Sequence, residues 1–222
     1  ENAVEAALQI KDSQEATVTV ISAGPSFALD VMKKPLSMGA DELVLLQDES
    51  FGNTVDSFFT AQVLAAAIRK LGGFDLIICG SHALDADTGQ VGPQLAEWLK
   101  IPQLTYANDV EIDGDKLTVT RTSEVEAQVC QTNMPALVTV NAEAYPPCYP
   151  SALAIMQAGS KPITTWNAAD LNLDQNKIGS AGSPTSVKKL FEPAKNKSCQ
   201  EISGNQEEII TQLAKLLAPY QK

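Results

Sequence analysis

The residues best suited to bind a ligand lie in the run FDLIICGSHALDADTGQVGP, between Phe74 and Pro93. Its apolar start, 76–79, predicts a strand buried on both faces, because a half-exposed strand would alternate polar and apolar residues. A helix is expected from 90 to 99, and the unpaired amides of its first turn would favour an anion beyond the carboxyl end of the strand. We therefore expect this loop to bind a phosphate group.

Several residues of the loop could take part in that binding or in catalysis. Gly80, Gly89 and Gly92 would let the backbone approach a ligand closely, although glycines at such positions also serve as simple turn residues. Asp85 and Asp87 could hold Mg²⁺ or act as an acid and base pair, whereas loop carboxylates more often cap turns and helix starts. Spacing alone leaves these alternatives open.

His82 is the single histidine of the chain, so any catalysis that needs an imidazole would depend on it. The alternative is a loop imidazole beside a ligand or in water. The chain contains neither a GxxxxGK[ST] loop nor a GxGxxG run after a strand. The residues by themselves therefore indicate a nucleotide-binding α/β domain, without specifying an activity.

The elements before this loop alternate between helix and strand. Strands are expected at 17–23 and 42–46, and helices at 26–38 and 55–71, with Pro35 kinking or ending the first of these helices. Such alternation indicates βαβ units and a doubly wound, mostly parallel sheet whose ligands gather at strand carboxyl ends. The chain opens at Glu1 on a helical pattern without a cap, and we expect a further strand to precede it.

The pattern changes after Ile101. An Asp113-Gly114 turn between apolar alternations predicts a β-hairpin over about 110–119, and further strands are expected at 125–129 and 136–140. A proline-rich loop, 145–150, precedes a short helix at 151–158, and the last amphipathic helix is expected at 207–217. We divide the chain into an α/β domain, 1–165, and a C-terminal arm with a helix that docks on a partner, 166–222.

Composition narrows the class of protein. A net charge of −11 over 222 residues argues against DNA or RNA as a partner, because nucleic-acid binding depends on clustered Lys and Arg. No apolar run is long enough to insert into a membrane, and the four cysteines form no CxxC pair. We expect a soluble, cytoplasmic protein with reduced thiols and no metal site.

The loop and several other segments of the chain resemble those of a known protein family. GSHALDADTGQVGP resembles the nucleotide loop of the electron-transfer flavoprotein β subunit, in which a related G-x-Q-A-I-D-x-D-x-x-Q-x-G run is typical. Further segments look like family segments in the right order, namely ENAVEAALQIK, VTVISAGP, LSMGADE, VEIDGDKLTVTR, MPALVTV and YPSALAIMQA. The resemblance covers nearly the whole chain.

The resemblance implies a carrier subunit, with no catalytic residue of its own, that pairs with an α subunit and exchanges electrons with a dehydrogenase or reductase. The redox FAD would be held mainly by the α subunit, and the β subunit would bind AMP or, as in electron-bifurcating relatives, a second FAD. DTGQVGP and GSPTSVKK look closer to this FAD-binding group. The implied cofactor-binding residues are Ala23, Gly80, His82, Ala83, Asp85, Asp87, Thr88, Gly89, Gln90 and Val91.

Departures from the family pattern qualify this interpretation. Ser81 and His82 stand where a basic residue and Gln are common, and Cys148 replaces the arginine of a P-R-Y motif. Ala152 stands where a large apolar residue usually anchors a dehydrogenase partner, so the usual acyl-CoA dehydrogenase partner is in doubt. The alternative is a nucleotide-hydrolysing or nucleotide-sensing α/β protein without a redox role.

Overall fold

The computed structural model describes residues 1–24, 29–51, 56–84, 87–122, 125–174, 182–185, 188–189, 191–192 and 201–220. The chain divides into two compact units, Glu1–Ser186 and Val187–Lys222, and each is considered by itself. The boundary between 165 and 166 that we placed on the sequence stays a prediction.

Helices and strands alternate through the first half of the first unit, as the sequence pattern predicts. In order these elements are α1 (Asn2–Ser13), β1 (Thr19–Ala23), α2 (Leu29–Met32), α3 (Lys34–Met38), β2 (Glu42–Leu46), a 3-10 turn (Glu49–Phe51), α4 (Ser57–Leu71), β3 (Leu76–Gly80) and α5 (Val91–Leu99). The remaining elements of this unit are β4 (Gln103–Asp113), β5 (Lys116–Thr122), β6 (Ala127–Asn133), β7 (Ala136–Val140), α6 (Ala152–Ala158) and β8 (Ile163–Trp166).

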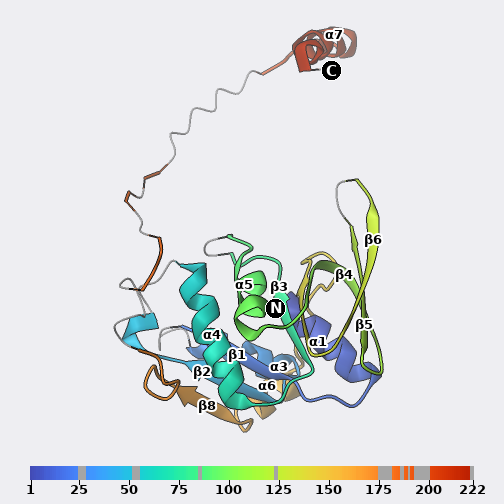
Figure 1. Cartoon of the computed structure of the whole chain (residues 1–222). Coiled ribbons are helices and arrows are strands. Elements are labelled where there is room, and N and C mark those ends of the chain that lie inside the picture. The colour runs from blue at the N-terminus through green and yellow to red at the C-terminus, as the bar shows by residue number, and fades with distance from the viewer. Residues whose placement is uncertain are drawn as a thin grey trace. The chain divides into compact units, whose positions relative to one another are not determined.

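The strands form two sheets (Figure 1). One is parallel with the order β1-β2-β8, and the other has the order β3-β7-β4-β5-β6. In the second sheet β3, β7 and β4 are parallel, whereas β4, β5 and β6 form the antiparallel addition that the Asp113-Gly114 turn predicts. The predicted α/β class, with a mostly parallel arrangement and a hairpin extension, is confirmed.

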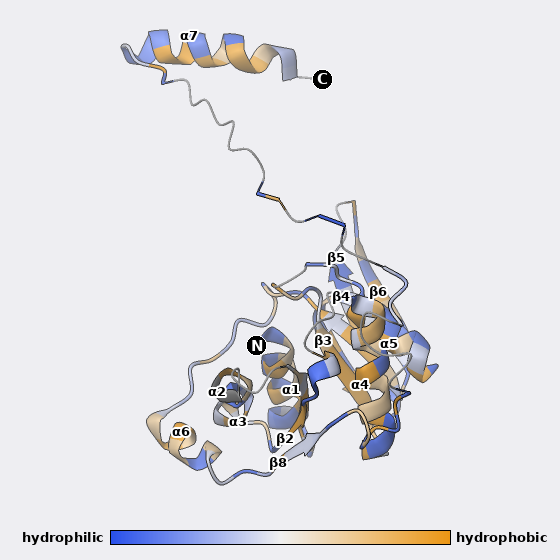
Figure 2. Ribbon diagram, turned by 90° about the vertical axis from the view of Figure 1, so that its left-hand side faces the viewer, coloured by the Kyte–Doolittle hydropathy of each residue, from blue (hydrophilic) through white to orange (hydrophobic). Residues whose placement is uncertain are grey.

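Helices cover both faces of the parallel strands. Figure 2 shows α1, α2 and α3 on one side of β2 and β3, and α4 and α5 on the other. In β2, Leu43 and Leu45 pack in the cluster of α3, whereas Val44 and Leu46 pack in the cluster of α4. All four side chains are buried, which explains why this strand reads as a continuous apolar run.

Several elements differ from their predicted bounds, and the strand expected at 125–129 is β6, which extends to Asn133. Of the helix expected at 26–38, residues 26–28 lie outside the described residues, and the rest forms two short helices separated at Lys33. Pro35 lies in the first turn of the second. Proline is compatible with that turn because its missing N–H would have no partner there. Strand β4 begins at Gln103, well before the hairpin that we expected from 110. Its pairing register shifts twice, and these irregular points interrupt the alternation of buried and exposed residues that marks a strand in the sequence.

The second unit contains α7 (Gln206–Leu217), followed by a 3-10 turn (Ala218–Tyr220). Asn205 and Glu208 form a capping box that satisfies two backbone amides at the start of α7. Its apolar side chains are exposed, namely Ile210, Leu213, Leu216 and Leu217. Among the described residues, no helix combines the length and the apolar character that a membrane crossing requires.

Asp48 joins the end of β2 to the segment after β8. Its carboxylate accepts hydrogen bonds from the Ser50 hydroxyl (2.6 Å), the Ser50 amide (2.9 Å) and the Ala168 amide (3.0 Å). These bonds, that of the Ser50 hydroxyl foremost, hold the pKa of Asp48 below the usual value of a carboxyl group. Ala168, whose amide donates one of these bonds, is buried in the hydrophobic cluster that also contains Val44 and Leu46 of β2.

Replacing Asp48 with Asn tests this attachment. We expect the free energy of unfolding at pH 7 to fall by about 1 kcal/mol, since bonds to a charged acceptor are weakened. Because the folded pKa is lowered, the stabilisation is complete above the unfolded pKa and disappears as the pH falls through the folded pKa. Urea unfolding at pH 7 and in strong acid measures the difference in unfolding free energy between the parent and the variant. Asp115→Asn, a change in the exposed turn between β4 and β5, is the control. If this difference in unfolding free energy were the same at both pH values, the charge of the Asp48 carboxylate would not be its cause.

Candidate functional site

The predicted ligand loop connects β3 to α5. Gly80 is the last residue of β3, Gln90 is the N-cap of α5, and the residues between them that are described are 81–84 and 87–89. The Ser57 hydroxyl donates to Gln90 Oε1 at 2.7 Å, so the first turns of α4 and α5 are neighbours. The loop therefore stands at the carboxyl end of a parallel strand, beside two helix N-termini, as in other α/β ligand sites.

The first turn of α5 presents unpaired donors. In the described part of the chain, the backbone amides of Val91 and Gly92 donate no hydrogen bond, and no side chain caps this helix. Pro93 follows and contributes no amide hydrogen. Together with the helix dipole, these two N–H groups can bind an anion such as a phosphate oxygen.

Glycine at position 92 brings α5 close to the sheet. A Cβ atom added at Gly92 would lie only 2.5 Å from Thr139 Cγ2 on β7. Thr139 is buried and β-branched, so its methyl group cannot move aside easily. The close approach fixes the position of the two donor amides relative to the strand ends.

The loop itself is folded back on its own backbone. The Asp87 amide donates to the Ala83 carbonyl at 2.9 Å, and Asp87 and Gly89 both have positive φ, +50° and +62°. Glycine adopts this conformation without the steric cost that other residues incur. Thr88 is exposed next to Gly89, so its hydroxyl is accessible to a ligand.

His82 and Asp87 face each other across the loop. His82 Nδ1 lies 3.5 Å from Asp87 Oδ1, and their side chains are 47% and 80% exposed. This geometry does not resemble a catalytic dyad, in which a buried carboxylate orients the imidazole. Both side chains are exposed to solvent, and a contact of this kind contributes little to stability.

The structure assembles most of the predicted site and leaves some of it apart. It brings together Gly80, His82, Ala83, Asp87, Thr88, Gly89, Gln90 and Val91 in one loop and one helix start. Ala23 lies at the end of β1, in the other sheet, where it pairs with Leu46. Asp85 lies outside the described residues, so the predicted pair of carboxylates has one described member.

Three residues at this edge were missed by the sequence reasoning. Ser57 contacts Gln90, and Asp56, the buried N-cap of α4, accepts a hydrogen bond from the Ser183 hydroxyl. The signal for Asp56 was present, since Asp immediately before a helical apolar pattern indicates an N-cap. Nothing local indicates that Ser183 would reach it, because 127 positions separate the two.

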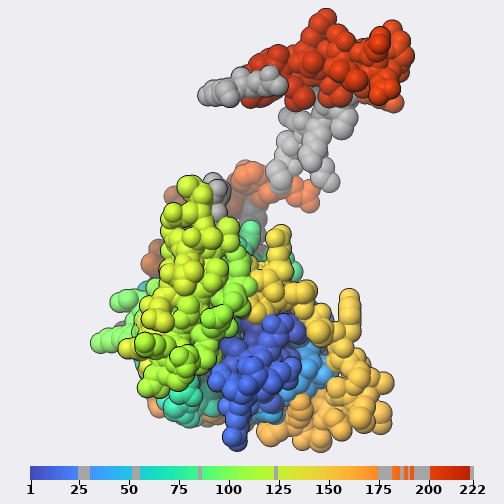
Figure 3. Space-filling view, turned by 90° about the vertical axis from the view of Figure 1, so that its right-hand side faces the viewer, coloured from blue at the N-terminus to red at the C-terminus, as the bar shows by residue number. Residues whose placement is uncertain are grey.

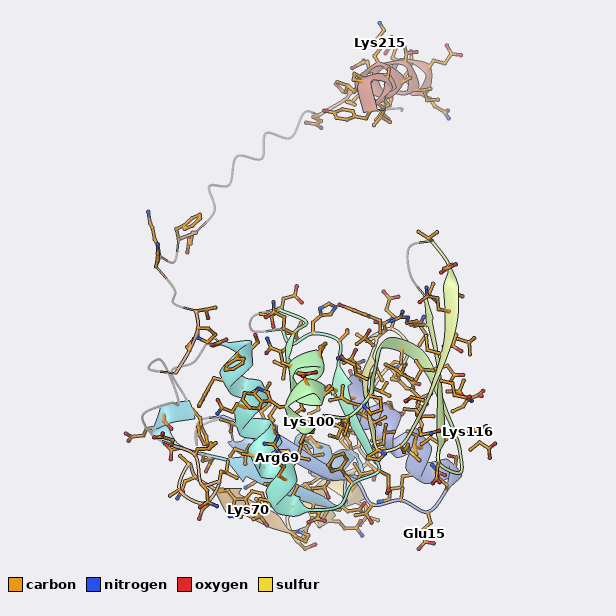
Figure 4. All side chains as sticks on the ribbon, in the orientation of Figure 1. Glu15, Arg69, Lys70, Lys100, Lys116 and Lys215 are labelled. Carbon is orange, nitrogen blue, oxygen red and sulfur yellow. The ribbon has the colours of Figure 1, made fainter. Side chains whose placement is uncertain are left out.

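Basic side chains are concentrated elsewhere. The loop from 80 to 92 contains no Lys or Arg. Figure 4 shows Arg69, Lys70 and Lys100 at the C-terminal ends of α4 and α5, where cations complement the helix dipoles. An anion at the loop would therefore depend mainly on backbone amides.

Cys79, the residue before Gly80, carries a partly buried thiol that packs against the cluster of α4 and α5. Burial raises its pKa to about 11, because desolvation disfavours the thiolate. A thiol in this state is a poor nucleophile and metal ligand. Cys79 therefore contributes packing beside the loop, and the structural role expected of all four cysteines stays a prediction.

A separate hollow lies between the C-terminal end of α1 and the β4–β5 hairpin, which stand side by side in Figure 3. Its volume is about 660 Å³, and its lining includes Gln14, Glu111, Asp113 and Lys116. None of the predicted site residues lines it. The predicted ligand loop therefore does not border this hollow.

The sequence of the chain is similar to those of known proteins over most of its length. A family model described as the electron transfer flavoprotein domain matches residues 1–171. The chain is 42% identical over 200 residues to an electron transfer flavoprotein subunit beta of Megasphaera elsdenii, with 87% of this chain and 74% of that protein covered. It is 42% identical over 219 residues to a subunit of the same name from Clostridium acetobutylicum, with 99% and 81% covered.

A third relative has a different name. It is subunit CarD of the caffeyl-CoA reductase–Etf complex of Acetobacterium woodii, 41% identical over 204 residues, with 91% of this chain and 78% of that protein covered. The likeness thus extends over most of each of these three proteins.

Gly92→Ala tests whether the close approach of α5 sets the site. The added Cβ would press on Thr139, so we expect a loss of about 1–3 kcal/mol in the free energy of unfolding. Displacement of the first turn should also weaken anion binding at the loop. Thermal unfolding with and without AMP measures both effects.

Gly159→Ala is the matched control, because a Cβ there would have only an ordinary contact, 3.7 Å from the Met156 carbonyl oxygen. Equal stability of the Gly92 and Gly159 variants would contradict the proposed constraint.

Proposed function

Because the chain belongs to the electron transfer flavoprotein family, with the role of a β subunit and electron carrier, we propose that its β3–α5 loop binds the adenosine phosphate part of a nucleotide. The nucleotide would be AMP or a second FAD. An α subunit would be the permanent partner, and a dehydrogenase or reductase the redox partner.

The unpaired amides of Val91 and Gly92 carry this proposal. They lie at the N-terminus of α5, beyond the carboxyl end of β3, and the loop before them turns through Gly89. This arrangement suits a phosphate held by backbone donors, and the sequence places no cation in the loop. Asp87 would then face ribose hydroxyls or loop amides, since a carboxylate repels phosphate.

A second FAD would occupy the same loop through its adenosine diphosphate half. The run DTGQVGP and the segment GSPTSVKK support this assignment through their family resemblance. Residues 182–185 of that segment lie at the start of α4, where the Ser183 hydroxyl donates to Asp56. When bound, FAD supplies the electron-transfer chemistry. The residues of this chain would bind it and orient it.

Identifying the bound nucleotide tests the proposal. The full chain, purified with its cognate α subunit, should carry a flavin and about one adenine nucleotide per β subunit. Mass spectrometry after gentle denaturation distinguishes one FAD plus AMP, a simple carrier, from two FADs, which would favour a bifurcating complex. A colourless, nucleotide-free complex would contradict the proposed function, and ATP turnover lost in Asp87→Ala would favour a hydrolase.

The loop 145–150 and α6 supply a candidate surface for the redox partner. Three apolar side chains of α6 are exposed, namely Leu153, Ile155 and Met156 at 63%, 56% and 79%. The Ser151 hydroxyl caps this helix by accepting from the Ala154 amide at 3.2 Å. Exposed apolar groups on an ordered helix suit docking on another protein.

A double variant, Leu153→Ser with Met156→Ser, tests this surface. Residues three apart lie on one face of a helix, so both changes affect the same patch. We expect electron transfer to the dehydrogenase to need at least about tenfold more carrier for half-maximal rate, since a buried Leu-sized side chain is worth ~1.5–3 kcal/mol. Steady-state reduction at several carrier concentrations measures this effect.

Gln157→Ser, an exposed polar change on the same helix, is the control for that experiment. Unchanged concentration dependence in the double variant, with the flavin spectrum intact, would place the redox partner elsewhere.

A further inference from the structure

Tyr106 has a backbone conformation that is unusual for a bulky residue. Its φ is +60°, in the left-handed region, although it lies within strand β4. The β4–β7 register shifts between Leu104 and Ala107, so Tyr106 occupies an irregular point of the strand. Aromatic residues rarely adopt this conformation unless the surrounding structure holds them in it, and such positions cluster at functional sites.

Two side chains of the neighbouring β7 region hold Tyr106. Its amide donates to Thr139 Oγ1 at 3.0 Å, and its carbonyl accepts from Asn141 Nδ2 at 3.2 Å. Thr139 is the buried residue whose methyl group faces Gly92 in the first turn of α5. One side chain therefore contacts both the irregular point of β4 and the start of the helix.

The side chain of Tyr106 reaches the neck of the ligand loop. Its ring centroid lies 5.9 Å from that of His82, with an angle of 56° between the planes. Gly89 lies between them: a Cβ added there would be 3.3 Å from His82 Nδ1, 3.5 Å from the Ser81 carbonyl oxygen and 3.6 Å from the Tyr106 hydroxyl. The two ends of the loop, 81–82 and 89, thus meet beneath the tyrosine.

This contact matters because of how the loop would bind phosphate. With no Lys or Arg between 80 and 92, binding depends on the direction of backbone N–H groups, and direction depends on loop conformation. A loop that samples many conformations loses affinity in proportion to the fraction that is not competent to bind. The group that closes the loop neck therefore controls affinity without touching the phosphate.

We propose that Tyr106 is a positioning residue for the nucleotide: it closes the neck of the 81–89 loop against His82 and Gly89. Thr139 and Asn141 hold its backbone in the left-handed conformation that directs the ring there. The inference rests on the proposed function of the loop and adds a residue from a different strand to it.

Tyr106→Gly separates positioning from folding. Glycine adopts φ near +60° without strain, which offsets the freedom it adds to the unfolded chain, so the variant should still fold while it lacks the ring. In the full chain with its α subunit, we expect AMP to bind about tenfold more weakly, as measured by calorimetry after removal of bound nucleotide. Tyr106→Phe keeps the ring and should restore most of the affinity.

Lys100→Gly is the matched control. Lys100 also has a positive φ, +58°, but it lies at the opposite end of α5. The Lys100→Gly variant should bind AMP with the affinity of the parent. Parental AMP affinity in Tyr106→Gly would overturn the inference, and so would a loss of melting temperature that accounts for the weaker binding. Absence of AMP and FAD binding in the parent complex would instead overturn the proposed function.

Discussion

The close approach of Gly92 to Thr139 sets the position of the first turn of α5 beside the proposed ligand loop. Thr139 lies on the face of β7 that packs against α5, beside Leu137, and the absence of a side chain at Gly92 lets the helix approach this strand closely. The position of the donor amides depends on this approach, and the hydroxyl of the same Thr139 side chain accepts the hydrogen bond of the Tyr106 amide. A larger residue at either position would separate the helix from the sheet.

Much of the fold follows from local patterns in the sequence. Strands β2, β3 and β7 are predicted because unbroken apolar runs are typical of strands covered on both faces, and the structure packs their alternate residues into different clusters. The loop after β3 is also predictable, since glycines and polar residues between a buried strand and a helix indicate a ligand site. Helix bounds agree closely where a clear stop exists, as at Gly72 after α4.

The parts that were not predicted depend on contacts between distant segments. Strand β4 starts earlier than its pattern indicates because its irregular points interrupt the alternation of exposed and buried residues. Tyr106 has no distinguishing neighbours along the chain, and its position is set by Thr139, which lies 33 residues away. The bond between Ser183 and Asp56 is likewise invisible to any local pattern. Propensity describes single elements, whereas these features arise where elements meet.

The partly buried thiol of Cys79 has a chemical consequence for a protein that carries electrons. Desolvation raises its pKa to about 11, so the thiol rather than the thiolate predominates at neutral pH. Peroxide, which reduced flavins form with oxygen, attacks thiolates rather than thiols. Among the cysteines that the structure describes, we therefore expect Cys79 at the strand end to react slowly with peroxide, and the exposed Cys148 to react before it.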